Sequence, residues 1–208
     1  MGQINHPMKL KETLESFGIK NFVETGTGDG SSMNKVIDTE VLDKQYGIEL
    51  DTELFRNLMK QYDGNENVII FNGYSEDCMD AVLEELSEDP TLFWLDAHFP
   101  GADYGPAGYG DEEDLNKRLP MEAELKIMKE KRDLSKDLIF MDDLRIYVDR
   151  DFEAGNWPER SKFGANGYDF VEELIGDTHI LVEHLADQGY LLAFPIDTEE
   201  ESIRELVR

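Results

Sequence analysis

The chain has 208 residues and carries 47 acidic against 20 basic side chains, a formal net charge of −27. So acidic a surface repels phosphate backbones, and the sequence holds no basic patch, so we expect no nucleic-acid substrate. No apolar run is long enough to span a membrane, and the lone Cys78 excludes an internal disulfide. We therefore expect a cytoplasmic protein without a membrane anchor, folded as one domain over residues 1–208. A high-salt habitat would also explain the acidity.

Strands and helices alternate along the chain. Helices are predicted at 9–17, from the caps Ser31 and Ser32, and at 52–62, 78–86, 120–131 and 168–175. Strands are predicted at 20–25, 45–50, 67–71, 91–95 and 138–141, with two more at 179–184 and 190–194. A short polar turn joins the last two strands, which indicates an antiparallel hairpin. The alternation predicts an α/β fold, with a mostly parallel sheet and helices on both faces. A terminal helix or a frayed end is expected from Thr198.

The first predicted strand runs into a glycine-rich turn, Glu24-Thr-Gly-Thr-Gly-Asp-Gly-Ser31. Glycine lets a backbone turn sharply and approach a ligand closely. The dinucleotide fingerprint G-x-G-x-x-G fits only in part, because Gly26 and Gly28 match its first two positions and Ser31 occupies the third. The pattern is instead E-x-G-x-G-x-G.

This pattern resembles the class I S-adenosylmethionine-dependent methyltransferases, and the likeness extends over essentially the whole chain. The resemblance implies a Rossmann-like, seven-stranded sheet and S-adenosylmethionine (SAM) as cofactor. It also implies that Glu24 contacts the methionine end of the cofactor and that the glycines line its ribose and methionine. The cofactor-binding residues expected are Glu24, Gly26, Thr27, Gly28, Gly30, Ser31, Glu49, Leu50, Ser75 and Asp96.

Two later segments supply further candidates for this binding site. Glu49 ends the second predicted strand about 20 residues after the glycine turn, a spacing that suits a carboxylate accepting hydrogen bonds from ribose hydroxyls. Asp51 is expected to cap the next helix. After the third strand, Ser75 and Glu76 match the family's adenine loop, although roles as turn and cap residues are equally consistent with the sequence.

Acidic residues also follow the fourth and fifth strands. Asp96 and His98 are two apart, so on an extended segment their side chains point the same way. Asp142 and Asp143 end the fifth strand, which we expect to lie beside the fourth. Carboxylates that converge in this way repel one another unless a cation is bound, and oxygen ligands suit Mg²⁺ or Mn²⁺. Loop capping is the alternative role for these aspartates.

This cluster resembles the divalent-metal-dependent O-methyltransferases, some of which act on catechols or sugars. The resemblance implies a metal held by Asp96, Asp142 and Asp143, with Asp96 and His98 as the catalytic residues. His98 is the candidate general base that removes the acceptor proton, and a purely structural histidine is the alternative. A loop at 100–110 rich in glycine, proline and tyrosine, and the stretch 147–168, are expected to border the acceptor.

The sequence therefore favours a SAM-dependent enzyme that methylates a hydroxyl of a small molecule or sugar. A SAM- or nucleotide-binding protein without methyl transfer is one alternative, and a protein-directed methyltransferase is another. The fourth strand ends in Leu95-Asp-Ala-His98, not in the (D/N)-P-P-(Y/F) motif of the amino-group DNA methyltransferases, which argues against nucleic-acid substrates. The acceptor's identity stays open, and so does association into a homo-oligomer.

Overall fold

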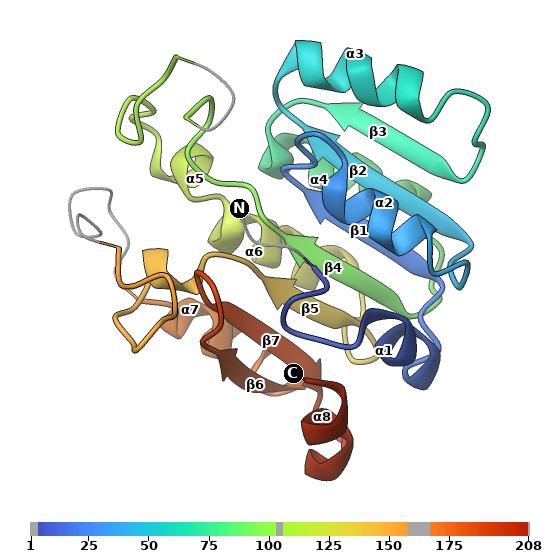
Figure 1. The fold of residues 1–208 in the computed structure, drawn as a ribbon, viewed down its shortest axis with the longest axis vertical. Helices are drawn as coiled ribbons and strands as arrows, with labels where there is room; N and C mark the ends of the chain where they lie inside the picture. The colour runs from blue at the N-terminus through green and yellow to red at the C-terminus, as the bar shows by residue number, and fades with distance from the viewer. Residues whose placement is uncertain (1–3, 103–105, 158–166, 208) are drawn as a thin grey trace.

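The structure is a computed structural model that describes residues 4–102, 106–157 and 167–207. Within these ranges seven strands form one sheet, in the order β3-β2-β1-β4-β5-β7-β6 (Figure 1). The strands are β1 (Asn21–Thr25), β2 (Lys44–Glu49), β3 (Val68–Asn72), β4 (Thr91–Leu95), β5 (Leu138–Met141), β6 (His179–His184) and β7 (Tyr190–Pro195). Strands β1 to β5 are parallel, and β7 lies antiparallel between β5 and β6. The predicted fold class is confirmed.

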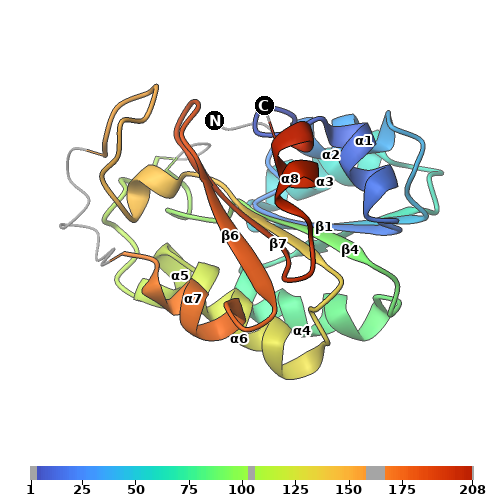
Figure 2. The same ribbon diagram turned by 90° about the horizontal axis from the view of Figure 1, so that it is seen from below.

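Helices cover both faces of this sheet (Figure 2). On one face lie α1 (Leu10–Ser16), α2 (Ser31–Ile37), α3 (Thr52–Gln61) and α8 (Glu200–Leu206). On the other lie α4 (Ser75–Glu85), α6 (Met121–Lys131) and α7 (Asp169–Ile175). The short α5 (Leu115–Arg118) precedes α6, and a single 3-10 turn, η1 (Leu144–Ile146), follows β5.

The central parallel strands β1, β4 and β5 are buried on both sides, as parallel strands between two helical layers must be, whereas the edge strands β3 and β6 are only partly buried. Successive side chains of a strand point to opposite faces. In β1, Phe22 therefore packs against the α1–α2 layer, while Val23 packs against the α4–α6 layer. Trp94 and Phe93 of β4 divide in the same way, and all four side chains are fully buried.

Local signals set the element boundaries, and some differ from the sequence-based prediction. Helix α2 begins at Ser31, but the predicted serine cap is wrong, because Gly30 is the N-cap and the Asp29 carboxylate accepts from the Ser31 N–H. The Ser31 hydroxyl donates instead to Asp29. Helix α4 begins at Ser75, three residues before the predicted start. The elements α5 and η1 were not predicted because they are too short to show a periodic pattern.

No helix in the described ranges combines the length and the apolar character that crossing a bilayer requires.

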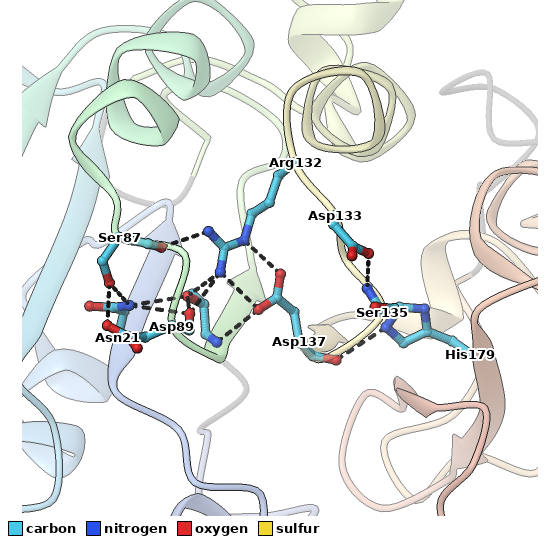
Figure 3. Close-up of polar contacts among 9 residues, drawn as sticks. Asn21, Ser87, Asp89, Arg132, Asp133, Ser135, Asp137 and His179 are labelled. Atoms are coloured by element: carbon cyan, nitrogen blue, oxygen red, sulfur yellow. Dashed lines mark hydrogen bonds and ion pairs between the residues drawn. The ribbon is translucent and has the colours of Figure 1, made fainter.

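A buried ion pair lies at the amino-terminal end of the sheet (Figure 3). The Nε of Arg132 donates to Asp137 over 2.7 Å, and the two side chains are only 5% and 1% exposed. The other guanidinium nitrogens donate to the backbone carbonyls of Ser87 and Asp89, each over 2.7 Å. Every nitrogen of this guanidinium therefore has an acceptor, which a buried charge requires.

The same ion pair joins three strands where they begin. Asp137 accepts a 2.8 Å hydrogen bond from the backbone N–H of Thr91, the first residue of β4. Its own carbonyl oxygen lies 3.1 Å from Nε2 of His179, the first residue of β6. Since Asp137 immediately precedes β5, the pair fixes the starts of β4, β5 and β6 relative to one another.

We expect Arg132→Ala to destabilise the protein by about 3–5 kcal/mol, because it leaves the Asp137 carboxylate buried without its counter-charge. The matched control is Arg204→Ala, which breaks an exposed pair with Glu200 one turn away in α8 and should change stability little. Chemical denaturation followed by circular dichroism measures both variants. Equal losses in the free energy of unfolding for the two variants would show that the buried pair stabilises the protein no more than the exposed one.

Candidate functional site

A cavity of about 890 Å³ opens at the carboxyl ends of β1, β2 and β4, the edge where ligands bind in open parallel sheets. Most of the residues predicted for the site line it, and the structure brings these together: Glu24, Gly26, Thr27, Gly28, Ser31, Glu49, Leu50, Ser75, Asp96, His98 and Asp143. Gly30 and Asp142 do not line it. The cavity is strongly acidic, with few cationic side chains in its wall.

The glycine turn shapes one wall of the cavity. Gly26 and Gly28 both have positive φ, at 72° and 60°, a region that residues with a Cβ rarely adopt. A Cβ at Gly26 would lie 2.8 Å from the backbone oxygen of Asp96, so only glycine lets β1 and β4 end this close together. Gly30 also has positive φ, and a Cβ there would lie 2.5 Å from the Tyr62 hydroxyl. Gly30 thus serves packing and the helix start.

Glu24 ends up buried beneath the turn, only 2% exposed, in the wall of the cavity. Its Oε2 has no hydrogen-bond partner among the described residues. Burial raises the pKa of Glu24 well above its usual value, although the Ser32 hydroxyl opposes the shift. A buried acceptor atom without a donor is costly, so this side chain is suited to a ligand that carries N–H groups or positive charge.

Glu49 is held in place by the turn that it faces. Its two oxygens accept hydrogen bonds from the backbone N–H groups of Gly28, over 2.7 Å, and Asp51, over 2.6 Å. Burial raises the pKa of Glu49, and these two hydrogen bonds oppose the shift. Asp51 itself caps α3, accepting from the N–H groups of Glu53 and Leu54, which confirms the predicted cap. The carboxylate of Glu49 is thereby fixed with lone pairs remaining for a ligand.

Ser75 and Glu76, the candidates from the third loop, form the first residues of α4 and line the same cavity. Both Glu76 oxygens lack hydrogen-bond partners within the part of the chain that the structure describes, while the Ser75 hydroxyl interacts with Glu124 of α6. Burial raises the pKa of Glu76. These groups are placed to meet the end of a ligand that extends away from the glycine turn.

At the opposite side of the cavity, Asp96, His98 and Asp143 form a cluster. Nε2 of His98 lies 2.8 Å from Oδ2 of Asp143, and its Nδ1 lies 3.8 Å from Oδ1 of Asp96. The imidazole therefore stands between two carboxylates. The pairing of β4 with β5 brings these residues together, because Leu95 and Met141 are register partners.

Asp142 points elsewhere. It is 2% exposed, its Oδ1 accepts the N–H of Asp143 over 2.7 Å, and its Oδ2 has no partner among the described residues. It borders a second, smaller cleft beneath the cluster, together with Glu124. Asp143 has a left-handed backbone, with φ 53°, which turns its side chain toward the cavity while Asp142 stays beneath. Of the three predicted metal ligands, only Asp96 and Asp143 therefore share the cluster.

The cluster has the donor set of a divalent cation site. One ligand atom from each of its three side chains lies within 4.8 Å of the other two. Metal–ligand bonds of about 2.1 Å would need only small side-chain adjustments, so these residues fit a cation. Two carboxylates with one imidazole suit Mn²⁺ better than Mg²⁺, which prefers oxygen ligands alone.

Burial, and after it the crowding of carboxylates, raises the pKa of the acids at this rim. Burial raises the pKa of Asp96 well above its usual value, and the neighbouring charges of Asp142 and Asp143 raise it further. Burial also raises the pKa of Asp142 well above its usual value, with Asp143 adding to the effect. The protein therefore favours a proton or a cation at this rim.

Sequence reasoning did not single out Glu124 of α6, which is fully buried below the cavity. Burial raises its pKa to about 7, while the hydroxyls of Ser75 and Thr25 oppose the shift. Arg145 and Gln188 were missed as well, and both line the cavity. The only sequence signal for Glu124 was its apolar neighbours at helical spacing, which is weak because acids on helices usually face solvent.

The two segments predicted to border an acceptor do reach the cavity. The loop at 100–110 contributes Pro100, Gly101 and Tyr109 to the cavity wall, and Phe99 lines the cavity just before it. The stretch 147–168 contributes Trp157. Tyr104 and residues 158–166 fall outside the described residues, so the predictions made for them stay untested.

No family model matches this chain, and no curated protein does. Solved structures do resemble it. A protein from Staphylococcus aureus assigned as a caffeoyl-CoA O-methyltransferase has a TM-score of 0.59 at 14% identity, over 89% of this chain and 80% of its own. A Podospora anserina methyltransferase bound to SAH has a TM-score of 0.56 at 15% identity, over 90% of this chain and 76% of its own. A Bacillus cereus O-methyltransferase in complex with SAH has a TM-score of 0.55 at 15% identity, over 89% of this chain and 78% of its own. At such identities the likeness establishes the fold.

We expect Gly26→Ala to destabilise the protein more than Gly64→Ala, although both glycines have positive φ. At Gly64 a Cβ meets nothing within 4 Å, so only backbone strain of about 1–2 kcal/mol applies. At Gly26 the added carbon also forces the end of β4 to move. Urea denaturation compares the two variants, and equal losses would contradict the close approach of β1 and β4.

We expect Glu124→Gln to remove a pH dependence of stability. The folded-state pKa of Glu124 is about 7, above the usual 4.5, so the folded state holds this proton more tightly. The stability that it contributes is full below pH 4.5 and is lost as pH rises to about 7, by about 3 kcal/mol in total. Denaturation of wild type and variant from pH 5 to 8 measures the difference. A constant difference over this range would contradict the raised pKa.

Proposed function

We propose that this protein is a SAM-dependent methyltransferase that transfers a methyl group to a hydroxyl oxygen of a small molecule or sugar. The observation that carries the proposal is the single cavity that joins the Glu24–Glu49 wall to the Asp96–His98–Asp143 cluster. The SAH bound by the Podospora anserina and Bacillus cereus proteins, which share the fold, supports the choice of cofactor. We propose that residues 1–208 act as one such domain in the cytoplasm.

The cofactor would lie against the glycine turn. The open oxygen of Glu24 would accept from the amino group of the methionine moiety, and the lone pairs of Glu49 would accept from the ribose hydroxyls. The positive φ at Gly26 and Gly28 brings the backbone close to the ligand. Ser75 and Glu76, at the start of α4, would meet the adenine.

Methyl transfer is an in-line displacement, in which the acceptor oxygen bonds to the methyl carbon as the carbon–sulfur bond breaks and its electrons pass to sulfur. The protein has to align the acceptor and remove its proton. Without a metal, His98 would perform the second task, because Asp143 orients the ring through Nε2 and Nδ1 faces the Asp96 side. With a divalent cation held by Asp96, His98 and Asp143, the imidazole would be a ligand, and the cation would instead act as a Lewis acid that polarises the acceptor hydroxyl.

Calorimetric titration with SAM, in Mn²⁺ and again in EDTA, tests the cofactor and the metal together. Saturable one-to-one binding is expected in both conditions, because the glycine turn and Glu49 do not depend on the cluster. Metal-dependent methylation of a vicinal diol would assign the cluster to a cation, and metal-independent methylation would assign it to proton removal by His98. Absence of SAM binding in both conditions would refute the proposal.

We expect Asp143→Asn to lower methyl transfer by about 100-fold or more, because it removes the charge that orients His98. Asparagine tolerates the left-handed backbone at this position, so the fold should persist. Asp187→Asn is the matched control, since Asp187 has the same backbone conformation, with φ 51°, and does not line the cavity. SAM affinity should hold in both variants. A fully active Asp143→Asn would show that methyl transfer does not depend on this cluster.

A further inference from the structure

Three cationic side chains line the described part of the cavity: Arg56, Lys117 and Arg145. Arg56 belongs to α3, the helix that follows β2, and Lys117 lies over the ring of Tyr74, 4.2 Å from its centroid. Arg145 follows β5, on the side of the Asp96–His98–Asp143 cluster. It is thus the cation on the side where the acceptor would bind.

The guanidinium of Arg145 is fixed by neutral groups. It lies 5.2 Å from the ring centroid of Trp157 and donates to the side-chain oxygen of Gln188. The backbone N–H of Arg145 also donates to the carbonyl of Gln188, over 3.1 Å. Although Asp143 is only two residues away, Arg145 forms no ion pair with any acid that the structure describes. Its charge is therefore held in position but not neutralised by contact.

One nitrogen of this guanidinium lacks an acceptor. The Nε of Arg145 is buried and has no hydrogen-bond partner within residues 4–102, 106–157 and 167–207. A buried N–H of a charged group without an acceptor costs free energy, which a ligand oxygen at the same place would recover. The planar fork of a guanidinium matches the oxygens of a carboxylate or phosphate.

A group of aromatic side chains adjoins this charge. The rings of Phe99 and Trp157 stack on each other, with an interplanar angle of 11° and centroids 5.6 Å apart. Tyr109 meets both edge-on, with centroids 5.2 Å and 5.1 Å away, and is 42% exposed. The group also borders the Asp96–His98–Asp143 cluster, because the rings of His98 and Phe99 lie 5.5 Å apart. A ring-shaped acceptor that packs against Tyr109 would have its substituents within reach of both the cluster and Arg145.

We propose that Arg145 binds an anionic group, a carboxylate or a phosphate, on the acceptor and thereby selects acidic ring-shaped acceptors over neutral ones. The proposal rests on the proposed function, which supplies the reacting hydroxyl. A net charge of −27 repels anions at long range, so an anionic acceptor needs such a local cation. Arg145 is a specificity residue here and takes no part in moving the proton.

Two pairs of probes test the proposal, each with one anionic member: 3,4-dihydroxybenzoate against 4-methylcatechol, and glucose 6-phosphate against glucose. Calorimetry measures their binding to the protein with and without SAH, so the readout does not depend on turnover. We expect the anionic member of at least one pair to bind about tenfold more tightly, which corresponds to about 1.4 kcal/mol. No preference for the anion in either pair would overturn the proposal.

Variants of Arg145 test whether this residue causes the preference for the anionic probe. Arg145→Gln should abolish it, and Arg145→Lys should keep a part of it, because lysine keeps the charge but loses the planar fork. Arg204→Gln changes the net charge equally, far from the cavity, and should leave the preference intact. In turnover, Arg145→Gln should raise KM for the anionic probe while kcat changes little. A preference that survives in Arg145→Gln would overturn the proposal, and the Lys variant provides the test if the Gln variant does not fold.

Failure of this proposal and failure of the proposed function give different results. If SAM binds and a neutral probe is methylated, but the anion has no advantage, only the role of Arg145 is wrong. If SAM does not bind, the proposed function is wrong, and the calorimetric preference still reports on Arg145.

Discussion

The constraint on which the site depends is the parallel register of β1, β4 and β5, which delivers acidic residues to one buried rim. Thr25 pairs with Leu95, and Leu95 with Met141, so whatever follows these residues must converge. Burial and mutual repulsion raise the pKa of Asp96 and Asp142 there. The fold thus holds negative charges together at an electrostatic cost, which a proton or a cation at this rim would lower.

The two sides of the cavity are suited to two different ligands. On the β1–β2 side, backbone N–H groups and carboxylates position a polar ligand, and glycine conformations set how closely it can approach. On the β4–β5 side lie a group of aromatic side chains, the guanidinium of Arg145 and the Asp96–His98–Asp143 cluster. Asp96 stands between them, next to Gly26 and close to His98. Such an arrangement suits a reaction that joins two different molecules, with each wall specialised for one of them.

The sequence predicted helices on both faces, the adjacency of the fourth and fifth strands and the cap at Asp51, because these follow from periodicity, the order of the elements and local hydrogen bonding. It also placed Glu49 at the binding site, from its spacing after the glycine turn and from the family resemblance. It did not predict which of two adjacent aspartates would face the cavity, since that depends on the left-handed backbone at Asp143. The sequence also did not predict roles for Arg145 and Glu124, because those roles depend on burial and on partners that are distant in the chain.

A buried polar anchor of the sheet, the Arg132–Asp137 pair, lies at the end of the strands opposite the cavity. Its partners are backbone groups at and just before the start of β4 and the imidazole of His179 at the start of β6, and none of them lines the cavity. Structural integrity and ligand recognition are thus assigned to opposite ends of the same strands. Apart from Gly26, where the backbone of Asp96 leaves no room for a Cβ, side chains at the rim can be exchanged over evolutionary time with little loss of stability, so this scaffold can acquire new substrates.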